Sequence, residues 1–372
     1  MLCMILVSCT GQKTGKENDN NDKIAIEVGE IKFPPQDVLQ LKSYYLSSSV
    51  HVDSIDYLIG YNYRLHSLDC MNLKSKSVTQ IVLPGDGPDA IVRLSGIYAQ
   101  SLDSVWISDE SERAFLIDSV GTIKRMIDLK KYLEDQEQLL INTNYAMFTS
   151  HLFYNASRHS LMFLVKHTPS NTFIVKEVFI DEVGKMATYQ LSSSKVVPDM
   201  SKGYAYINFP NVNFVGENIV YNYPVESSIY MLDIRTNERK YILADSHYTS
   251  NIIEKCTTSG DYATLEKHWL ENFHFYDIMY LPKYKIYARL HADKVDFDEK
   301  KGMEKLINER DLYLMLFDEN MEKIGETKLS NCRYSPFTSW NATYGGIALF
   351  VDNVLDEKNN TDDLTIDIIS LK

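Results

Sequence analysis

The sequence predicts an all-β fold: a six-bladed β-propeller with four-stranded blades, whose last blade is completed by the N-terminal strand. Two observations lead to this prediction. The chain of 372 residues contains 25 tyrosines and 15 phenylalanines, an aromatic content that suits half-buried sheet surfaces. Strand-like stretches also recur in groups of four, and four strands within roughly 40–50 residues is the repeat length of a propeller blade.

Five repeat units share one pattern, in which an apolar strand, a short polar turn and a second apolar strand end at an aspartate. The stretches "YLIGYNYRLHSLD" (57–69) and "SVWISDESERAFLID" (104–118) show it most simply. A further strand-like stretch precedes each unit, and another follows each aspartate. These aspartates are Asp69, Asp118, Asp181, Asp233 and Asp318. Because an aspartate carboxylate accepts hydrogen bonds from N–H groups two residues on, we expect all five to start turns and to be structural.

A sixth unit begins at "FTSWNA" (337–342) and contains strand-like stretches at 345–352 and 364–370, but no fourth strand follows them. The segment "KIAIEVGEIKF" (23–33) is strand-like and belongs to no other unit. We expect it to complete the sixth blade, because pairing the two ends of the chain removes two long unpaired sheet edges.

Three insertions interrupt the strand pattern. In residues 260–273, apolar side chains at helical spacing (Leu265, Trp269 and Leu270) predict a short helix, and residues 130–140 are a second candidate helix. Residues 293–311 are highly charged and are expected to form a solvated excursion between two strands. Long loops of this kind gather on one face of a propeller and often form its binding surface.

The first residues predict export and lipid anchoring. Leu6-Val7-Ser8-Cys9 resembles the lipobox of bacterial lipoprotein signal peptides, in which cleavage occurs before a cysteine that carries a diacylglycerol. Residues 1–8 would then be a signal-peptide remnant, residues 9–22 a polar tether, and residues 23–372 the propeller. The run lacks the basic start of a signal peptide, so we expect the true start codon to lie upstream. The alternative is an N-terminal strand that happens to contain a cysteine.

Composition excludes several classes of protein. The formal net charge of −13 argues against nucleic acid and against anionic lipid surfaces as partners. No later stretch reaches the roughly 18 consecutive apolar residues of a membrane-spanning helix. The five cysteines form no C-x-x-C pair, and the nine histidines are scattered, so no metal site, disulfide framework or cofactor is predicted. The sequence contains no familiar hydrolase, metalloprotease or nucleotide-binding motif, and no catalytic residues are assigned.

The stretch "GDGPDAI" (85–91) between the first two units is the candidate binding loop. Its glycines permit positive φ angles and its proline stiffens the turn, so that the aspartates would project at a rim. The candidate residues are Gly85, Asp86, Gly87, Pro88 and Asp89. The alternative is an inter-blade turn shaped only for packing, since turn chemistry alone explains these residue types.

The lipobox, the six units and the "GDGPDAI" stretch together resemble the TolB-like six-bladed propeller lipoproteins of Bacteroides-type bacteria. The resemblance implies a lipid-anchored protein of the cell envelope, at the outer membrane, and carries no catalytic residues to transfer. We expect a binding or scaffolding module for an exported protein, peptide or glycan. The alternative is a propeller enzyme, a lyase or hydrolase, acting at the channel mouth; converging His, Asp or Arg side chains there would favour it.

Overall fold

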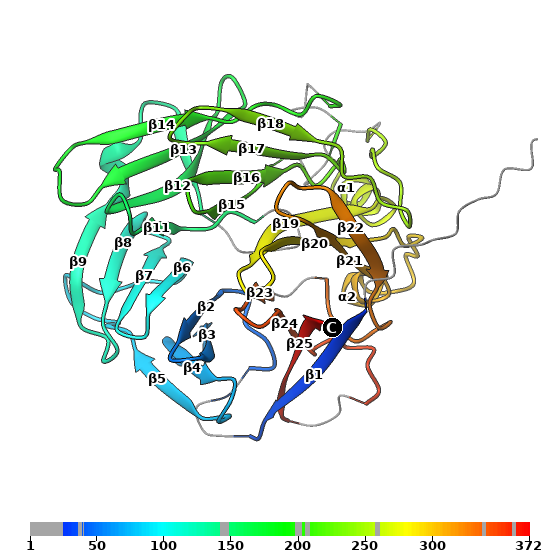
Figure 1. The fold of residues 1–372 in the computed structure, drawn as a ribbon, viewed down its shortest axis with the longest axis horizontal. Coiled ribbons are helices and arrows are strands. Elements are labelled where there is room, and N and C mark those ends of the chain that lie inside the picture. The colour runs from blue at the N-terminus through cyan, green and yellow to red at the C-terminus, as the bar shows by residue number, and fades with distance from the viewer. Residues whose placement is uncertain are drawn as a thin grey trace, which may run out of the picture.

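Six antiparallel sheets surround a central axis and form the six blades of a propeller (Figure 1). The computed structural model describes residues 25–35, 39, 41–141, 149–197, 203–204, 209–256, 261–336, 340–358 and 362–372. Cys9, the remnant 1–8 and the tether 9–22 lie outside these residues. The predicted all-β fold and its blade count are confirmed.

The first three blades are consecutive in the chain. Within each of them the strands follow in order from the innermost, at the channel, to the outermost (Figure 1). Blade 1 contains β2 (Ser47–Val52), β3 (Ile55–Asn62), β4 (Ser67–Asn72) and β5 (Val78–Val82). Blade 2 contains β6 (Leu94–Ser101), β7 (Ser104–Asp109), β8 (Arg113–Ile117) and β9 (Ile123–Asp128). Blade 3 contains β10 (Glu137–Leu140), β11 (Phe153–Asn155), β12 (Ser160–His167), β13 (Thr172–Phe179) and β14 (Met186–Gln190).

The remaining blades close the ring. Blade 4 contains β15 (Asn211–Val215), β16 (Asn218–Asn222), β17 (Ile229–Asp233) and β18 (Arg239–Ile242). Blade 5 contains β19 (His274–Leu281), β20 (Ile286–Ala292), β21 (Leu312–Phe317) and β22 (Lys323–Lys328). Blade 6 contains β23 (Trp340–Ala342), β24 (Ile347–Phe350), β25 (Leu364–Leu371) and β1 (Ile26–Phe33).

The N-terminal strand closes the ring as predicted. β1 pairs antiparallel with β25 in a continuous register from Ile26 opposite Leu371 to Phe33 opposite Leu364. In Figure 1 the blue and red ends of the ribbon therefore lie side by side. The outermost strand of blade 6 comes from one end of the chain and its three inner strands from the other, so both ends are held in one sheet.

Three of the five predicted aspartate turns are confirmed. Oδ1 of Asp118, Asp233 and Asp318 each accepts hydrogen bonds from two backbone N–H groups of the turn that follows. The prediction for Asp69 is wrong, because Asp69 lies inside β4, buried, where its Oδ2 accepts hydrogen bonds from Tyr44 and Asn62. The turn of blade 1 is instead started by Asn72, whose Oδ1 accepts from the N–H groups of residues 74 and 75.

Asp181 also departs from the predicted role. It lies after β13, and its carboxylate contacts Arg125 of the neighbouring blade, with Oδ1 3.1 Å from Nη1. The turn that begins there is closed by a backbone hydrogen bond from Phe179 N–H to Lys185 O. The aspartate therefore contributes a contact between blades 2 and 3 in place of a turn cap.

The insertions were predicted with mixed success. The helix in 260–273 is confirmed as α1 (Tyr262–Leu270), with Trp269 and Leu270 buried. Residues 130–140 are not an α-helix: a 3-10 turn (Leu129–Tyr132) precedes β10, because pairing with β12 outweighs the local helix preference.

The charged segment 293–311 is only partly a solvated excursion. It contains α2 (Met303–Asn308), whose Leu306 and Ile307 are buried in the apolar cluster that joins blades 3, 4 and 5. Because most residues of this segment are charged, its sequence did not indicate that Leu306 and Ile307 would be buried.

The connections sort onto two faces because the blades are antiparallel. Connections from the second to the third strand of a blade, and from its fourth strand to the next blade, share one face. This face carries the long connections, namely 34–46, 83–93, 129–136, 191–210, 243–273, 293–311, 329–339 and 351–363. The opposite face carries only short turns. No helix in the described segments has the length and apolar character needed to cross a bilayer.

Candidate functional site

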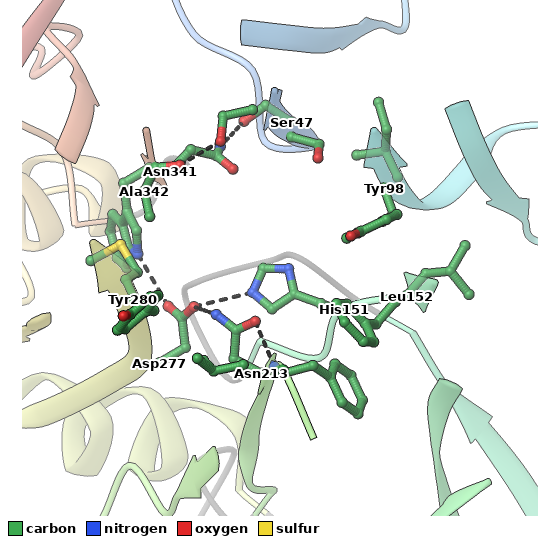
Figure 2. A pocket seen from close by; sticks show the side chains of 18 residues that line it. Ser47, Tyr98, His151, Leu152, Asn213, Asp277, Tyr280, Asn341 and Ala342 are labelled. Carbon is green, nitrogen blue, oxygen red and sulfur yellow. Dashed lines mark hydrogen bonds and ion pairs between the residues drawn. The ribbon is translucent and has the colours of Figure 1, made fainter. Parts of the chain in front are cut away.

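The first strand of every blade lines one pocket of about 330 Å³ in the central channel. This volume lies at the lower end of the range of about 300–1,000 Å³ that is typical of small-molecule sites. We call it the channel pocket, and Figure 2 shows it from close by. Its lining residues are Ser47, Ser48, Ser49, Ile97, Tyr98, His151, Leu152, Phe153, Asn213, Phe214, Val215, Gly216, Asp277, Met279, Tyr280, Trp340, Asn341 and Ala342.

A single buried carboxylate gathers the polar groups on one wall of the channel pocket. Asp277 lies on β19 and is 2% exposed. Its Oδ2 lies 3.1 Å from His151 Nε2 and 3.4 Å from Asn213 Nδ2, and its Oδ1 accepts a hydrogen bond of 3.1 Å from Trp340 Nε1. Three donors from three other blades therefore compensate a charge that burial alone would disfavour.

His151 reaches this carboxylate because the inner strand of blade 3 is split. β10 pairs with the second half of β12 and β11 with its first half, so two separate strands form the inner edge of blade 3. Just before β11, Ser150 forms a parallel bridge with Val212 of blade 4, and His151 N–H donates to Val212 O. This pairing places the His151 side chain beside Asn213 and facing blade 5 (Figure 2).

Asn213 is fixed between blades 4 and 5. Its Nδ2 donates to Ile278 O at 2.9 Å as well as lying near Asp277, and its Oδ1 accepts from Phe214 N–H at 2.8 Å. Because both ends of the amide are engaged, Asn213 supports the carboxylate and leaves the contacts with a ligand to other groups.

The opposite wall of the channel pocket carries uncharged polar groups. Asn341 Nδ2 donates to Ser47 Oγ at 2.5 Å, Ser49 Oγ donates to Ala342 O, and Ser48 Oγ accepts from Ala99 N–H at 3.0 Å. Tyr98 points its hydroxyl towards the centre of the pocket in Figure 2. Burial raises the pKa of Tyr98, so this hydroxyl stays protonated and can donate.

Aromatic rings form the apolar part of the lining. Phe153 stacks on Phe214 with ring centroids 4.9 Å apart, and Tyr98 meets Phe153 edge to face at 5.1 Å. The Trp340 indole packs edge to face on Tyr276 at 4.7 Å. Such contacts hold the rings in fixed positions, which gives the pocket a preformed shape.

The candidate loop 85–91 lies elsewhere. Gly85, Asp86, Gly87, Pro88 and Asp89 are exposed and occur in the connection from β5 to β6, on the face of the long connections. Hydrogen bonds from Ala90 N–H to Gly87 O and from Ile91 N–H to Pro84 O close the turn, and Gly87 has a φ of 90°. None of these residues lines the channel pocket, which extends to Gly216 in a short turn on the opposite face.

The sequence contained a signal for the residues that were missed. His151, Asn213, Asp277 and Asn341 each interrupt a mostly apolar stretch that was recognised as the first strand of a unit. First strands line the channel of a propeller, so a polar residue within one faces either the channel or a neighbouring blade. Among the described residues, no group of three or more His, Cys, Asp or Glu is arranged to hold a metal ion.

The closed ring and its lined channel define a six-bladed β-propeller protein with an internal ligand-sized pocket. The chain belongs to the family described as a domain of unknown function, DUF4221, whose sequence profile matches residues 17–328. No curated protein matches the chain in sequence.

Solved structures of similar fold include two from Bacteroides species. A member of the DUF4221 family from Bacteroides vulgatus is 14% identical, with a TM-score of 0.75 over 93% of this chain and 98% of that one. A Bacteroides fragilis protein, provisionally described as exported, is 12% identical, with a TM-score of 0.51 over 95% of this chain and 97% of that one. At these identities the likeness establishes the fold alone.

Proposed function

We propose that this chain is a lipid-anchored binding protein of the bacterial cell envelope that holds a small ligand, or the end of a larger one, in the channel pocket. The observation that carries the proposal is the pocket itself, to which all six blades contribute and in which a buried carboxylate is compensated by donors from three other blades. Because these polar groups are satisfied by one another, the wall of the pocket is held in a fixed geometry, which supports a preformed ligand site.

Export and anchoring are supported by two features. Leu6-Val7-Ser8-Cys9 has the residue pattern of a lipobox, and the Bacteroides fragilis protein of similar fold is provisionally described as exported. With Cys9 as the lipid attachment site of the tether 9–22, the propeller would stand off the membrane, with its channel accessible to an exported protein, peptide or glycan. We also propose that the propeller is of the TolB-like type that the sequence resembles.

A second candidate function is an enzyme, and the His151–Asp277 pair favours it. A carboxylate that bonds one ring nitrogen of a histidine orients the imidazole, and the other nitrogen can then act as a general base. Binding remains the first choice because the pair is the single His–carboxylate contact among the residues that line the pocket. No Lys or Arg lines the pocket, so an enzymatic site would have to stabilise a developing charge with neutral donors such as Tyr98 and Ser48.

Trp340 provides the experiment, because its indole lines the pocket, whereas Trp106 in blade 2 and Trp269 in α1 do not. A library of sugars, short peptides and metabolites is screened by thermal shift, and each hit is titrated by tryptophan fluorescence. We expect a hit to change the emission of the wild type but not that of Trp340→Phe. Hits that change neither protein's emission would contradict a ligand site in the channel.

The same titrations separate the two candidate functions. Mass spectrometry of each mixture shows whether the hit is recovered unchanged, as expected for a binding protein. Conversion that stops in His151→Ala, while thermal stabilisation by the hit persists, would replace the binding function with an enzymatic one.

A further inference from the structure

We propose that the channel pocket recognises an uncharged, polyhydroxylated ring, that is, a neutral sugar residue, alone or at the end of an oligosaccharide. This inference rests on the proposed function, since it takes the channel pocket to be the ligand site. It is argued from the charge of the lining, the accessibility of Asp277, the hydrogen-bonding groups and the aromatic surface.

The charge of the lining excludes anionic ligands. Among the 18 residues that line the pocket there is one carboxylate, Asp277, and no lysine or arginine. A phosphate, sulfate or carboxylate entering the pocket would lose its hydration without gaining a cationic partner other than His151, and it would face the Asp277 charge.

The accessibility of Asp277 argues against a ligand bound through an ammonium group. An ammonium ion offers only donors and would need direct contact with the carboxylate to offset its desolvation. Asp277 is 2% exposed, and its oxygens already face His151, Asn213 and Trp340. Its role is therefore to orient these side chains, and the ligand meets the groups that they and the opposite wall present.

Those groups include both donors and acceptors, and they are uncharged. Ser48 Oγ accepts a backbone hydrogen bond, which leaves its hydroxyl hydrogen to donate, whereas Ser49 uses its hydrogen on Ala342 O and can accept. Tyr98 presents a protonated hydroxyl that both donates and accepts. A ligand hydroxyl is likewise donor and acceptor at once, so several adjacent hydroxyls match such a mixed lining better than ions do.

The aromatic surface complements the other part of a sugar. A pyranose ring has an apolar C–H face beside its hydroxyls, and it packs on aromatic rings as other amphipathic groups do. Tyr98, Phe153 and Phe214 form a continuous row of rings along one side of the pocket. At about 330 Å³ the pocket lies at the lower end of ligand-site volumes, which suits a small ligand such as a monosaccharide or the end of an oligosaccharide.

The test uses matched sugars that differ only in charge. Binding to the folded chain is measured by saturation-transfer NMR and calorimetry with glucose, galactose and mannose, with glucuronate and galacturonate, and with glucosamine and galactosamine. Maltose and lactose are added to distinguish a free sugar from an oligosaccharide end. We expect at least one neutral sugar to bind, and its uronate and amino counterparts to bind at least tenfold more weakly.

Tyr98→Phe removes only the hydroxyl in the pocket, and Tyr63→Phe, at an exposed tyrosine on the β3–β4 connection, is its matched control. Loss of one neutral hydrogen bond should weaken the neutral sugar about three- to tenfold in Tyr98→Phe and leave Tyr63→Phe unchanged. A sugar that binds Tyr98→Phe as tightly as the wild type would overturn the inference, as would tighter binding of the uronate or the amino sugar.

Failure of this inference is distinguishable from failure of the proposed function. If none of the sugars binds but another library compound changes Trp340 emission, the channel pocket is still the ligand site and the neutral sugar is the wrong ligand class.

Discussion

His151 Nε2 lies 3.1 Å from Asp277 Oδ2, although 126 residues separate them in the sequence. This contact joins blade 3 to blade 5 on the channel side of blade 4. The same carboxylate accepts from Trp340 of blade 6 and lies near Asn213 of blade 4, so one buried charge connects four blades at the channel. On the other side, Asn341 and Ser47 join blades 6 and 1. The inner wall is thus held by polar contacts between blades as well as by apolar packing.

Asp277→Asn should destabilise the protein. The amide keeps the shape of the carboxylate but turns one acceptor into a donor, which then faces a donor from His151, Asn213 or Trp340. We expect a loss of about 1–3 kcal/mol in the free energy of unfolding, the cost of an unsatisfied buried polar group. Urea denaturation measures it. Asp86→Asn, in the exposed turn 85–91, is the matched control and should stay within about 0.5 kcal/mol of the wild type. Equal stability of the two variants would contradict the role given to Asp277.

Stability should fall in acid because of Glu326. Burial raises the pKa of this carboxyl, but hydrogen bonds from His291, Ser246 and the His247 N–H outweigh it and lower the pKa to about 2. The folded pKa lies below the ordinary 4.5, so the stabilisation is present above pH 4.5 and is lost as the pH falls from 4.5 towards 2. A pKa shift from 4.5 to about 2 corresponds to about 3 kcal/mol in the free energy of unfolding.

Unfolding free energies measured between pH 7 and pH 3 check this expectation. His291 adds to the same trend, because burial lowers its pKa below 6.5 and protonation therefore favours the unfolded chain. Glu326→Gln should be less stable at pH 7 and should lose less stability between pH 4.5 and pH 3 than the wild type. An identical pH profile for the two proteins would show that Glu326 does not carry this dependence.

Removal of β1 should open the ring. A chain that begins at Pro34 lacks the partner of β25 along eight residue pairs, and also the ion pair between Glu30 and Arg333. The exposed edge of β25 becomes free to pair with another molecule. We expect a lower melting temperature, measured by thermal unfolding, and aggregation, measured by size-exclusion chromatography. A chain that begins at Ala25 is the matched control and should behave as the full chain. Equal behaviour of the two truncated chains would contradict closure by β1.

Cys9→Ala tests the proposed anchor. Without the thiol no diacylglycerol can be attached, so the variant should lose labelling by radioactive palmitate and leave the membrane fraction of the cells that produce it. Cys332→Ala changes one of the free thiols of the propeller and should keep both properties. Retention of Cys9→Ala in the membrane fraction would refute the assignment.

The strands were predictable because their signals are local. Alternating apolar residues, aromatic content and turn residues identified each unit and the strand that completes blade 6. Where the prediction failed, a distant partner had outweighed the local signal. Residues 137–140 form a strand because β12 offers an edge to pair with, and Asp69 is buried because Tyr44 and Asn62 donate to it.

By itself, the sequence determined how many blades the protein has and how the ring closes, because a repeat and an unpartnered strand can be read along the chain. The position of the channel pocket, in contrast, follows from the tertiary structure alone. The channel pocket takes its residues from six strands spread between Ser47 and Ala342, and no local pattern relates them. His151 faces Asp277 because β10 and β11 are separate strands and the residue before His151, Ser150, pairs with Val212 of blade 4.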